Sequence, residues 1–173
     1  MKKTTMKRIL SPKHDWLYLD RPSERVVRVS NGHWIIVLDS SEFYTCPEFT
    51  GFLPEMDNDD VNLTRAKGLC FTYGQRYDKD CPKFDNVIPK DVLEPITRSD
   101  DLKDTARNGE KHMYARKFNG GDVVTWLSET YLDIIADATG DAGKWSAKDE
   151  NSPAVLSAGG DVLAVLMPIH VPS

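Results

Sequence analysis

Cysteine is scarce in this 173-residue chain, and its three copies, Cys46, Cys70 and Cys81, form no closely spaced pair. An odd number of cysteines without close spacing argues against a disulfide framework, and against the paired thiol ligands of a structural zinc site. We therefore expect buried or idle thiols in a reducing compartment, which favours the cytoplasm.

Long apolar runs are also missing. No segment approaches the roughly 20 consecutive apolar residues that cross a bilayer, and the basic N-terminus is not followed by the apolar stretch of a secretory signal. The composition, with 40% apolar and 28% charged residues, is typical of one globular domain with its own core. We expect a single domain over residues 14–173 and no membrane partner.

Positive charge is concentrated at the start of the chain. Residues 1–13 contain five Lys or Arg and no acid, whereas the whole chain has a formal net charge of −5, so the other 160 residues carry −10. We expect residues 1–13 to form a basic arm that could contact phosphate. The candidate phosphate contacts are Lys2, Lys3, Lys7 and Arg8 in the arm, and Arg116 and Lys117 further along the chain. The acidic remainder argues against broad nonspecific binding to nucleic acid.

Motifs for catalysis and cofactor binding are lacking as well. The four histidines are scattered, and neither Gly120-Gly121 nor Gly159-Gly160 has the rest of a phosphate-binding pattern. The acidic segment 57–60 lacks the turn glycine and the distal glutamate of a calcium loop. We expect a non-enzymatic protein with no cofactor and no metal.

Alternating apolar residues predict strands in the first part of the chain. Residues 16–20, 25–29 and 33–38 predict a three-stranded meander, with Asn31-Gly32 as a hairpin turn. Residues 45–110 have no sustained periodicity and predict a long irregular insertion, with one strand that follows Gly68.

The last part of the chain predicts a strand, a helix and three further strands. A strand is expected over 112–118, and Asn119 or Asp122 is expected to cap a helix that ends near Gly140, because apolar residues then recur every three or four positions. Strands are expected over 145–148, 153–157 and 162–169. The predicted fold class is α+β: a mostly antiparallel sheet with one main helix packed on it, and a long irregular insertion.

Several segments resemble the bacterial β sliding clamp, the processivity ring of DNA polymerase. The segment 118–127, FNGGDVVTWL, is similar to the start of a clamp helix, and Ser152-Pro153-Ala154-Val155-Leu156 is similar to the penultimate strand of a clamp. Val165-Leu166-Met167-Pro168-Ile169 resembles the closing strand of a clamp. The segment 27–36 is loosely similar to an early clamp strand, with Asn31 in place of an aspartate.

The resemblance implies a lone clamp-like domain that binds a protein partner. Leu166, Met167, Pro168 and Ile169 would form the wall of a pocket that binds short peptides of polymerases and other DNA-metabolism enzymes. The simpler alternative is that this strand closes the core. A processivity role would require several copies of the chain to associate. The helix is acidic where clamp helices contact DNA, which argues against a DNA-encircling ring built from this chain alone and leaves DNA binding open. The alternative function is that of an acidic inhibitor or decoy from a phage or mobile element that blocks a DNA-acting protein.

Overall fold

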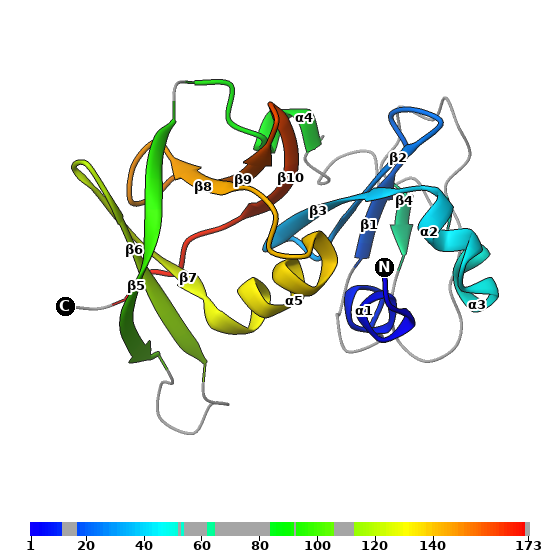
Figure 1. Ribbon diagram of the computed structural model, residues 1–173, viewed down its shortest axis with the longest axis horizontal. Coiled ribbons are helices and arrows are strands. Elements are labelled where there is room, and N and C mark those ends of the chain that lie inside the picture. The colour runs from blue at the N-terminus through cyan, green and yellow to red at the C-terminus, as the bar shows by residue number, and fades with distance from the viewer. Residues whose placement is uncertain are drawn as a thin grey trace. The chain divides into compact units, whose positions relative to one another are not determined.

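The computed structural model describes residues 1–11, 17–51, 53, 62–64, 84–91, 93–105 and 113–171. The chain divides into two compact units, Met1–Val87 and Ile88–Ser173, and each is described by itself (Figure 1). The strand expected after Gly68, the acidic segment 57–60, Cys70 and Cys81 lie outside the described residues.

The first unit contains a four-stranded antiparallel sheet. Its strands are β1 (Leu17–Asp20), β2 (Val26–Ser30), β3 (Trp34–Asp39) and β4 (Asn62–Thr64), in the order β4-β1-β2-β3. The predicted meander is confirmed, and so is its hairpin turn. The Asn31 side-chain oxygen accepts hydrogen bonds from the backbone N–H groups of His33 at 3.0 Å and Trp34 at 3.2 Å, which fixes the turn.

Helices accompany this sheet, and one of them replaces the expected arm. They are α1 (Lys3–Ile9), α2 (Ser41–Tyr44), α3 (Pro47–Thr50) and α4 (Phe84–Val87). Met6 and Ile9 of α1 are fully buried, and the N-terminal ammonium group lies 2.8 Å from the Glu42 carboxylate of α2. The start of the chain is therefore anchored by buried apolar side chains. The lysine-rich composition of this segment did not predict their burial.

The second unit contains a six-stranded antiparallel sheet and the longest helix. Its strands are β5 (Glu94–Asp104), β6 (Tyr114–Gly120), β7 (Val123–Ser128), β8 (Lys144–Ala147), β9 (Ala154–Ala158) and β10 (Asp161–Leu166), in the order β10-β9-β8-β5-β6-β7. Helix α5 (Glu129–Thr139) packs against β6, β7 and β10. The predicted fold class, α+β with one main helix on an antiparallel sheet, is confirmed, as are the three strands near the C-terminus.

The expected helix start at 119–122 is wrong. These residues end β6 and turn into β7, with Gly121 at a φ of 52°. Along β7 burial alternates at first, since Val123, Thr125 and Leu127 are buried and Val124 is exposed, as expected for a strand. The helix begins at Glu129, and its N-cap is Ser128, six residues after Asp122; the Ser128 hydroxyl accepts a hydrogen bond from the Tyr131 N–H at 3.5 Å.

The longest strand lies inside the predicted irregular insertion. β5 has 11 residues, pairs with β8 through its first three, and pairs with β6 from Thr97 onward. Gly120 of β6 passes so close to this strand that a Cβ atom there would lie 1.8 Å from the Pro95 carbonyl oxygen. The close approach explains why glycine occupies this position.

Candidate peptide-binding groove

The C-terminal segment 167–171 lies beside strand β7 of the second unit. β7 is at the end of the strand order, so one of its edges has no neighbouring strand within this sheet. The Ile169 N–H donates a hydrogen bond to the Trp126 carbonyl at 2.8 Å. Because backbone groups alternate in direction along a strand, Val124 and Trp126 both direct their peptide groups away from β6.

A groove of about 390 Å³ is formed where this segment meets β7. Polar and apolar residues both line it, and the apolar ones are Val124 and Trp126 from β7 and Met167, Pro168 and Ile169 from the C-terminal segment. Two of these side chains are exposed for their type: Val124 is 42% and Met167 is 37% accessible. The groove therefore presents apolar side chains to solvent next to outward-facing peptide groups.

The rim of the groove is polar and well ordered by hydrogen bonds. Its described lining includes Glu150, Asn151 and His170. The carboxylate of Asp149 accepts hydrogen bonds from the backbone N–H groups of Asn151 at 2.9 Å and Ser152 at 2.7 Å. The pKa of Asp149 is lowered from its usual value, mainly by a hydrogen bond from the side chain of Ser152. An ionised side chain therefore accepts hydrogen bonds from two backbone N–H groups of the loop 149–152.

The structure separates the four pocket residues predicted from the sequence. Met167, Pro168 and Ile169 line the groove, whereas Leu166 is fully buried in the core at the end of β10. The sequence did not single out Val124 as a groove residue. A strand pattern would have indicated it, because Val124 is an apolar residue whose two neighbours along the strand face the core, so its own side chain faces outward.

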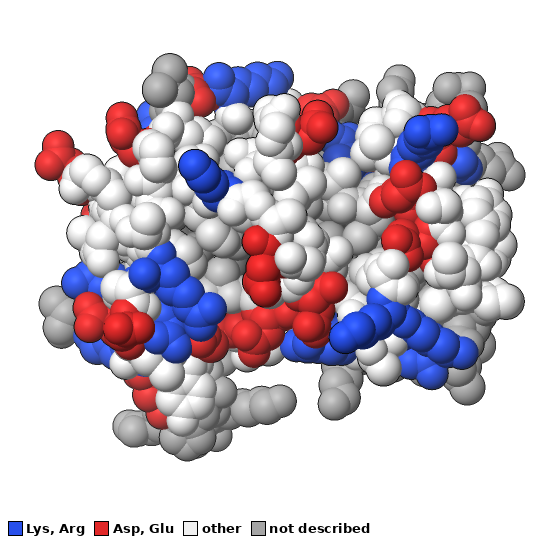
Figure 2. All heavy atoms as spheres, in the orientation of Figure 1, with Lys and Arg blue, Asp and Glu red and all other residues white. Residues whose placement is uncertain are grey.

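The candidate phosphate contacts fall in different units. Lys2, Lys3, Lys7 and Arg8 are exposed at or within α1. Arg116 and Lys117 lie on β6, where each has a carboxylate partner: Glu129 at 2.7 Å for Arg116 and Asp101 at 3.3 Å for Lys117. These ion pairs compete with phosphate for the two cations. Figure 2 shows acidic side chains gathered along α5, so this helix presents negative charge.

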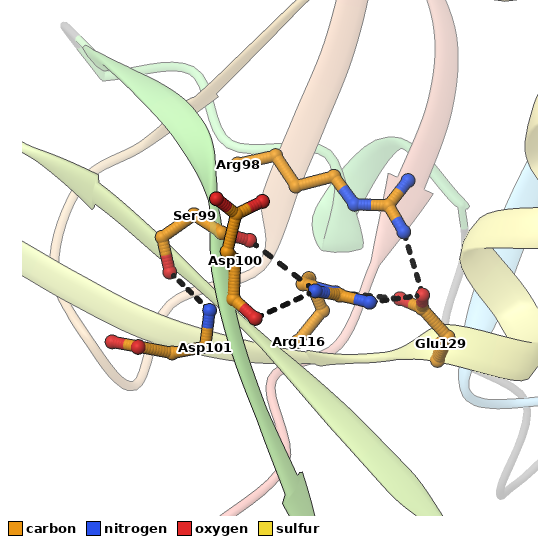
Figure 3. A network of polar contacts seen from close by, with 6 residues as sticks. All are labelled: Arg98, Ser99, Asp100, Asp101, Arg116 and Glu129. Carbon is orange, nitrogen blue, oxygen red and sulfur yellow. Dashed lines mark hydrogen bonds and ion pairs between the residues drawn. The ribbon is translucent and has the colours of Figure 1, made fainter.

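Arg116 belongs to a polar network that the sequence analysis missed (Figure 3). Between Arg98 and Leu102, strand β5 places three residues opposite a single residue of β6, and Arg116 fills this bulge by donating to the carbonyls of Ser99 at 3.5 Å and Asp100 at 3.0 Å. The Glu129 carboxylate joins Arg98 at 2.6 Å and Arg116 at 2.7 Å. Hydrogen bonding from Arg116 is the main cause that lowers the pKa of Glu129 below its ordinary value of 4.5.

Neither a metal-binding cluster nor a membrane-spanning helix occurs among the described residues. These residues contain no group of three or more His, Cys, Asp or Glu side chains placed to hold a metal ion. Among the helices of the described part, none has the length and apolar character needed to cross a membrane.

Comparison with solved structures shows a likeness to a sliding clamp. The DNA polymerase sliding clamp from Pseudomonas aeruginosa, solved with ligand, aligns with a TM-score of 0.41 and 15% sequence identity. The alignment covers 95% of this chain and 59% of that chain, so this chain spans about three fifths of the clamp chain that it matches. No protein-family model matches the sequence, and the search of curated proteins gives no match.

Proposed function

We propose that this protein is a non-enzymatic binding module that takes up a short apolar segment of a partner protein in the groove beside β7. The observation that carries the proposal is the exposure of Met167 and Val124 on the walls of the same groove. Methionine is unbranched and adapts its shape to different apolar ligands, which suits a surface that accepts several partners. Proline has no N–H, so Pro168 ends strand pairing and lets the chain form a wall.

The edge of β7 supports an extended ligand. Peptide groups that point away from β6 can bond to an added strand, while alternate side chains of that strand enter pockets. Ile169 already uses the Trp126 carbonyl in this way. An added segment would therefore reach the backbone of Val124 and place an apolar side chain against Met167.

The partner that we propose is an enzyme of DNA metabolism, such as a polymerase, and the role is that of a processivity-type accessory. The support is the resemblance of residues 165–169 to the closing strand of the sliding-clamp family. A ring built from a chain of only 173 residues would require several copies. Light scattering coupled to size exclusion tests this role: a closed oligomer supports it, and a monomer at working concentration contradicts it.

The groove is tested with a fluorescein-labelled clamp-binding peptide and a scrambled version of it, titrated against the full chain by fluorescence anisotropy. We expect Met167→Asp to weaken binding by at least about tenfold, because a charge replaces an apolar contact. Met113→Asp is the matched control, since Met113 is a 47% exposed methionine that does not line the groove. Equal affinity of Met167→Asp and wild type would exclude the groove. Equal affinity for the native and scrambled peptides would exclude a clamp-type motif.

A further inference from the structure

A second cavity, separate from the groove, lies beneath helix α5 in the same unit. It has a volume of about 560 Å³, within the range of small-molecule sites. The sheet opens here because pairing of β5 with β8 covers Glu94–Ile96, after which β5 continues beside β6 alone. The C-terminal half of α5 and the loop that follows it form the opposite wall.

The inner surface of this cavity is apolar. Phe118 and Trp145 meet edge-to-face with ring centroids 6.1 Å apart, and Ile135 of α5 lies among the lining residues. The two threonines of the wall use their hydroxyl groups internally: Thr97 donates to the Asn119 carbonyl at 3.1 Å and Thr139 to the Ile135 carbonyl at 2.9 Å. Their polar atoms therefore do not change the apolar character of the interior.

The cavity is maintained by backbone geometry as well as by side chains. Gly143, at a φ of 99°, brings the loop after α5 against β9, and a Cβ atom there would lie 2.7 Å from the Ser157 carbonyl oxygen. The loop is therefore held at a fixed distance from β9 at the base of the cavity. Preformed shape of this kind lowers the entropic cost of binding.

The lining carries more positive than negative charge. Arg98 and Lys144 line the cavity together with a single acid, Asp141, among the described lining residues. The Arg98 and Arg116 guanidinium groups both pair with the single Glu129 carboxylate, so this group of three side chains has a net positive charge. Lys144 is exposed, and no ion pair involves it within the described part of the chain.

We propose that this cavity binds a small amphipathic anion, a compact apolar body that carries one carboxylate or sulfonate. The apolar body lies against Phe118 and Trp145, where its burial supplies most of the affinity. The anionic group lies toward Lys144 and Arg98, which supply charge-assisted hydrogen bonds. A neutral ligand of the same shape fills the cavity equally well but adds no negative charge for Lys144, and it leaves Arg98 with only the Glu129 carboxylate that it shares with Arg116.

The test uses two probes with the same ring system. 1-Anilinonaphthalene-8-sulfonate carries the anion, and N-phenyl-1-naphthylamine lacks it. Both are titrated against the full chain, with energy transfer from tryptophan as the readout, since Trp145 is part of the cavity wall. We expect one saturable site for the sulfonate and about tenfold weaker binding of the neutral probe, which corresponds to one charge-assisted hydrogen bond.

Matched variants assign the site. Ala136→Phe fills the cavity and should abolish binding of both probes, whereas Ala138→Phe places the same side chain on α5 at a position that does not line the cavity. Lys144→Glu should weaken the sulfonate by about tenfold or more and leave the neutral probe within about twofold. Lys148→Glu is its control, because Lys148 lies just beyond β8 and pairs with Asp91 at 2.8 Å.

Three outcomes would overturn the proposal: sulfonate binding that survives Ala136→Phe, an equal loss with Lys148→Glu and Lys144→Glu, or equal affinity for the two probes. Circular dichroism of each variant confirms that it is folded, and Lys144→Glu, a surface change, keeps the test valid if Ala136→Phe fails to fold. The peptide titration of the groove uses neither probe, so the two sites are tested separately.

Discussion

Replacing Glu129 with glutamine should destabilise the second unit in a pH-dependent way. Glu129 is the first residue of α5, and its side chain is 21% accessible. The carboxylate accepts hydrogen bonds from Arg98 Nη2 at 2.6 Å, Arg116 Nη2 at 2.7 Å and Arg116 Nε at 3.2 Å. Glu129→Gln keeps the shape and removes the charge that both guanidinium groups share.

The expected loss follows from two contributions. Charge-assisted hydrogen bonds of a partly accessible carboxylate contribute about 1 kcal/mol after allowance for solvent screening. A negative charge in the first turn of a helix adds about 0.5 kcal/mol through the helix dipole. Glu129→Gln should therefore lower the free energy of unfolding by about 1.5 kcal/mol.

The loss should become smaller in acid. Arginine lowers the pKa of Glu129 below 4.5 in the folded protein, so the stabilisation is complete above that value and is lost as the pH falls through the lowered pKa. Urea unfolding followed by tryptophan fluorescence, at about pH 7 and about pH 3, measures both effects. Equal stability of wild type and variant at neutral pH, or a difference that is unchanged in acid, would refute the role assigned to this carboxylate.

Two further predictions concern the β6–β7–α5 segment. Gly120→Ala should lower the free energy of unfolding by more than about 2 kcal/mol, because its Cβ would lie 1.8 Å from the Pro95 carbonyl oxygen. Gly121→Ala, which has open space but a φ of 52°, should lower it by about 1 kcal/mol. A smaller loss for Gly120→Ala than for Gly121→Ala in urea unfolding would contradict the close approach. Ser128→Ala removes the hydroxyl that accepts from the Tyr131 N–H at 3.5 Å and should lower stability by about 1 kcal/mol; an unchanged unfolding midpoint would show that the cap is not used.

Local patterns were enough to predict much of this sheet. The apolar segments 25–29 and 33–38, with Asn31-Gly32 between them, predicted β2, β3 and their turn. Alternation and turn residues after Lys144 likewise predicted β8, β9 and β10. Strand β2 is marked by alternating burial, whereas β3 is buried at Trp34, Ile35 and Ile36 and is marked by its aromatic and β-branched residues.

The errors have physical causes that a local pattern does not contain. Val123, Leu127 and Tyr131 are four residues apart, so the last residues of a strand and the first turn of α5 together imitate a single helix face. In β5 Ile96 alone is buried, so this strand has no apolar period and is held by its pairing with β6 and β8. Its bulge and the network around Arg116 depend on residues distant in sequence.

The candidate groove could be predicted in part. Its C-terminal wall was visible as an apolar segment that contains Met167-Pro168, but the opposite wall depends on β7 being a strand, which the sequence analysis assigned to a helix. The cavity beneath α5 could not be predicted at all, because it exists where β8 stops pairing with β5, and nothing local to either strand marks that point.

The most direct test of the groove is a map of backbone amide chemical shifts during titration with the clamp-binding peptide. If the groove is the binding site, the largest changes fall on residues 124–126 and 167–169, and they saturate together with the anisotropy signal. Saturable binding that leaves these amides unchanged and perturbs another surface, such as the β5–β6 hairpin, would contradict the proposal.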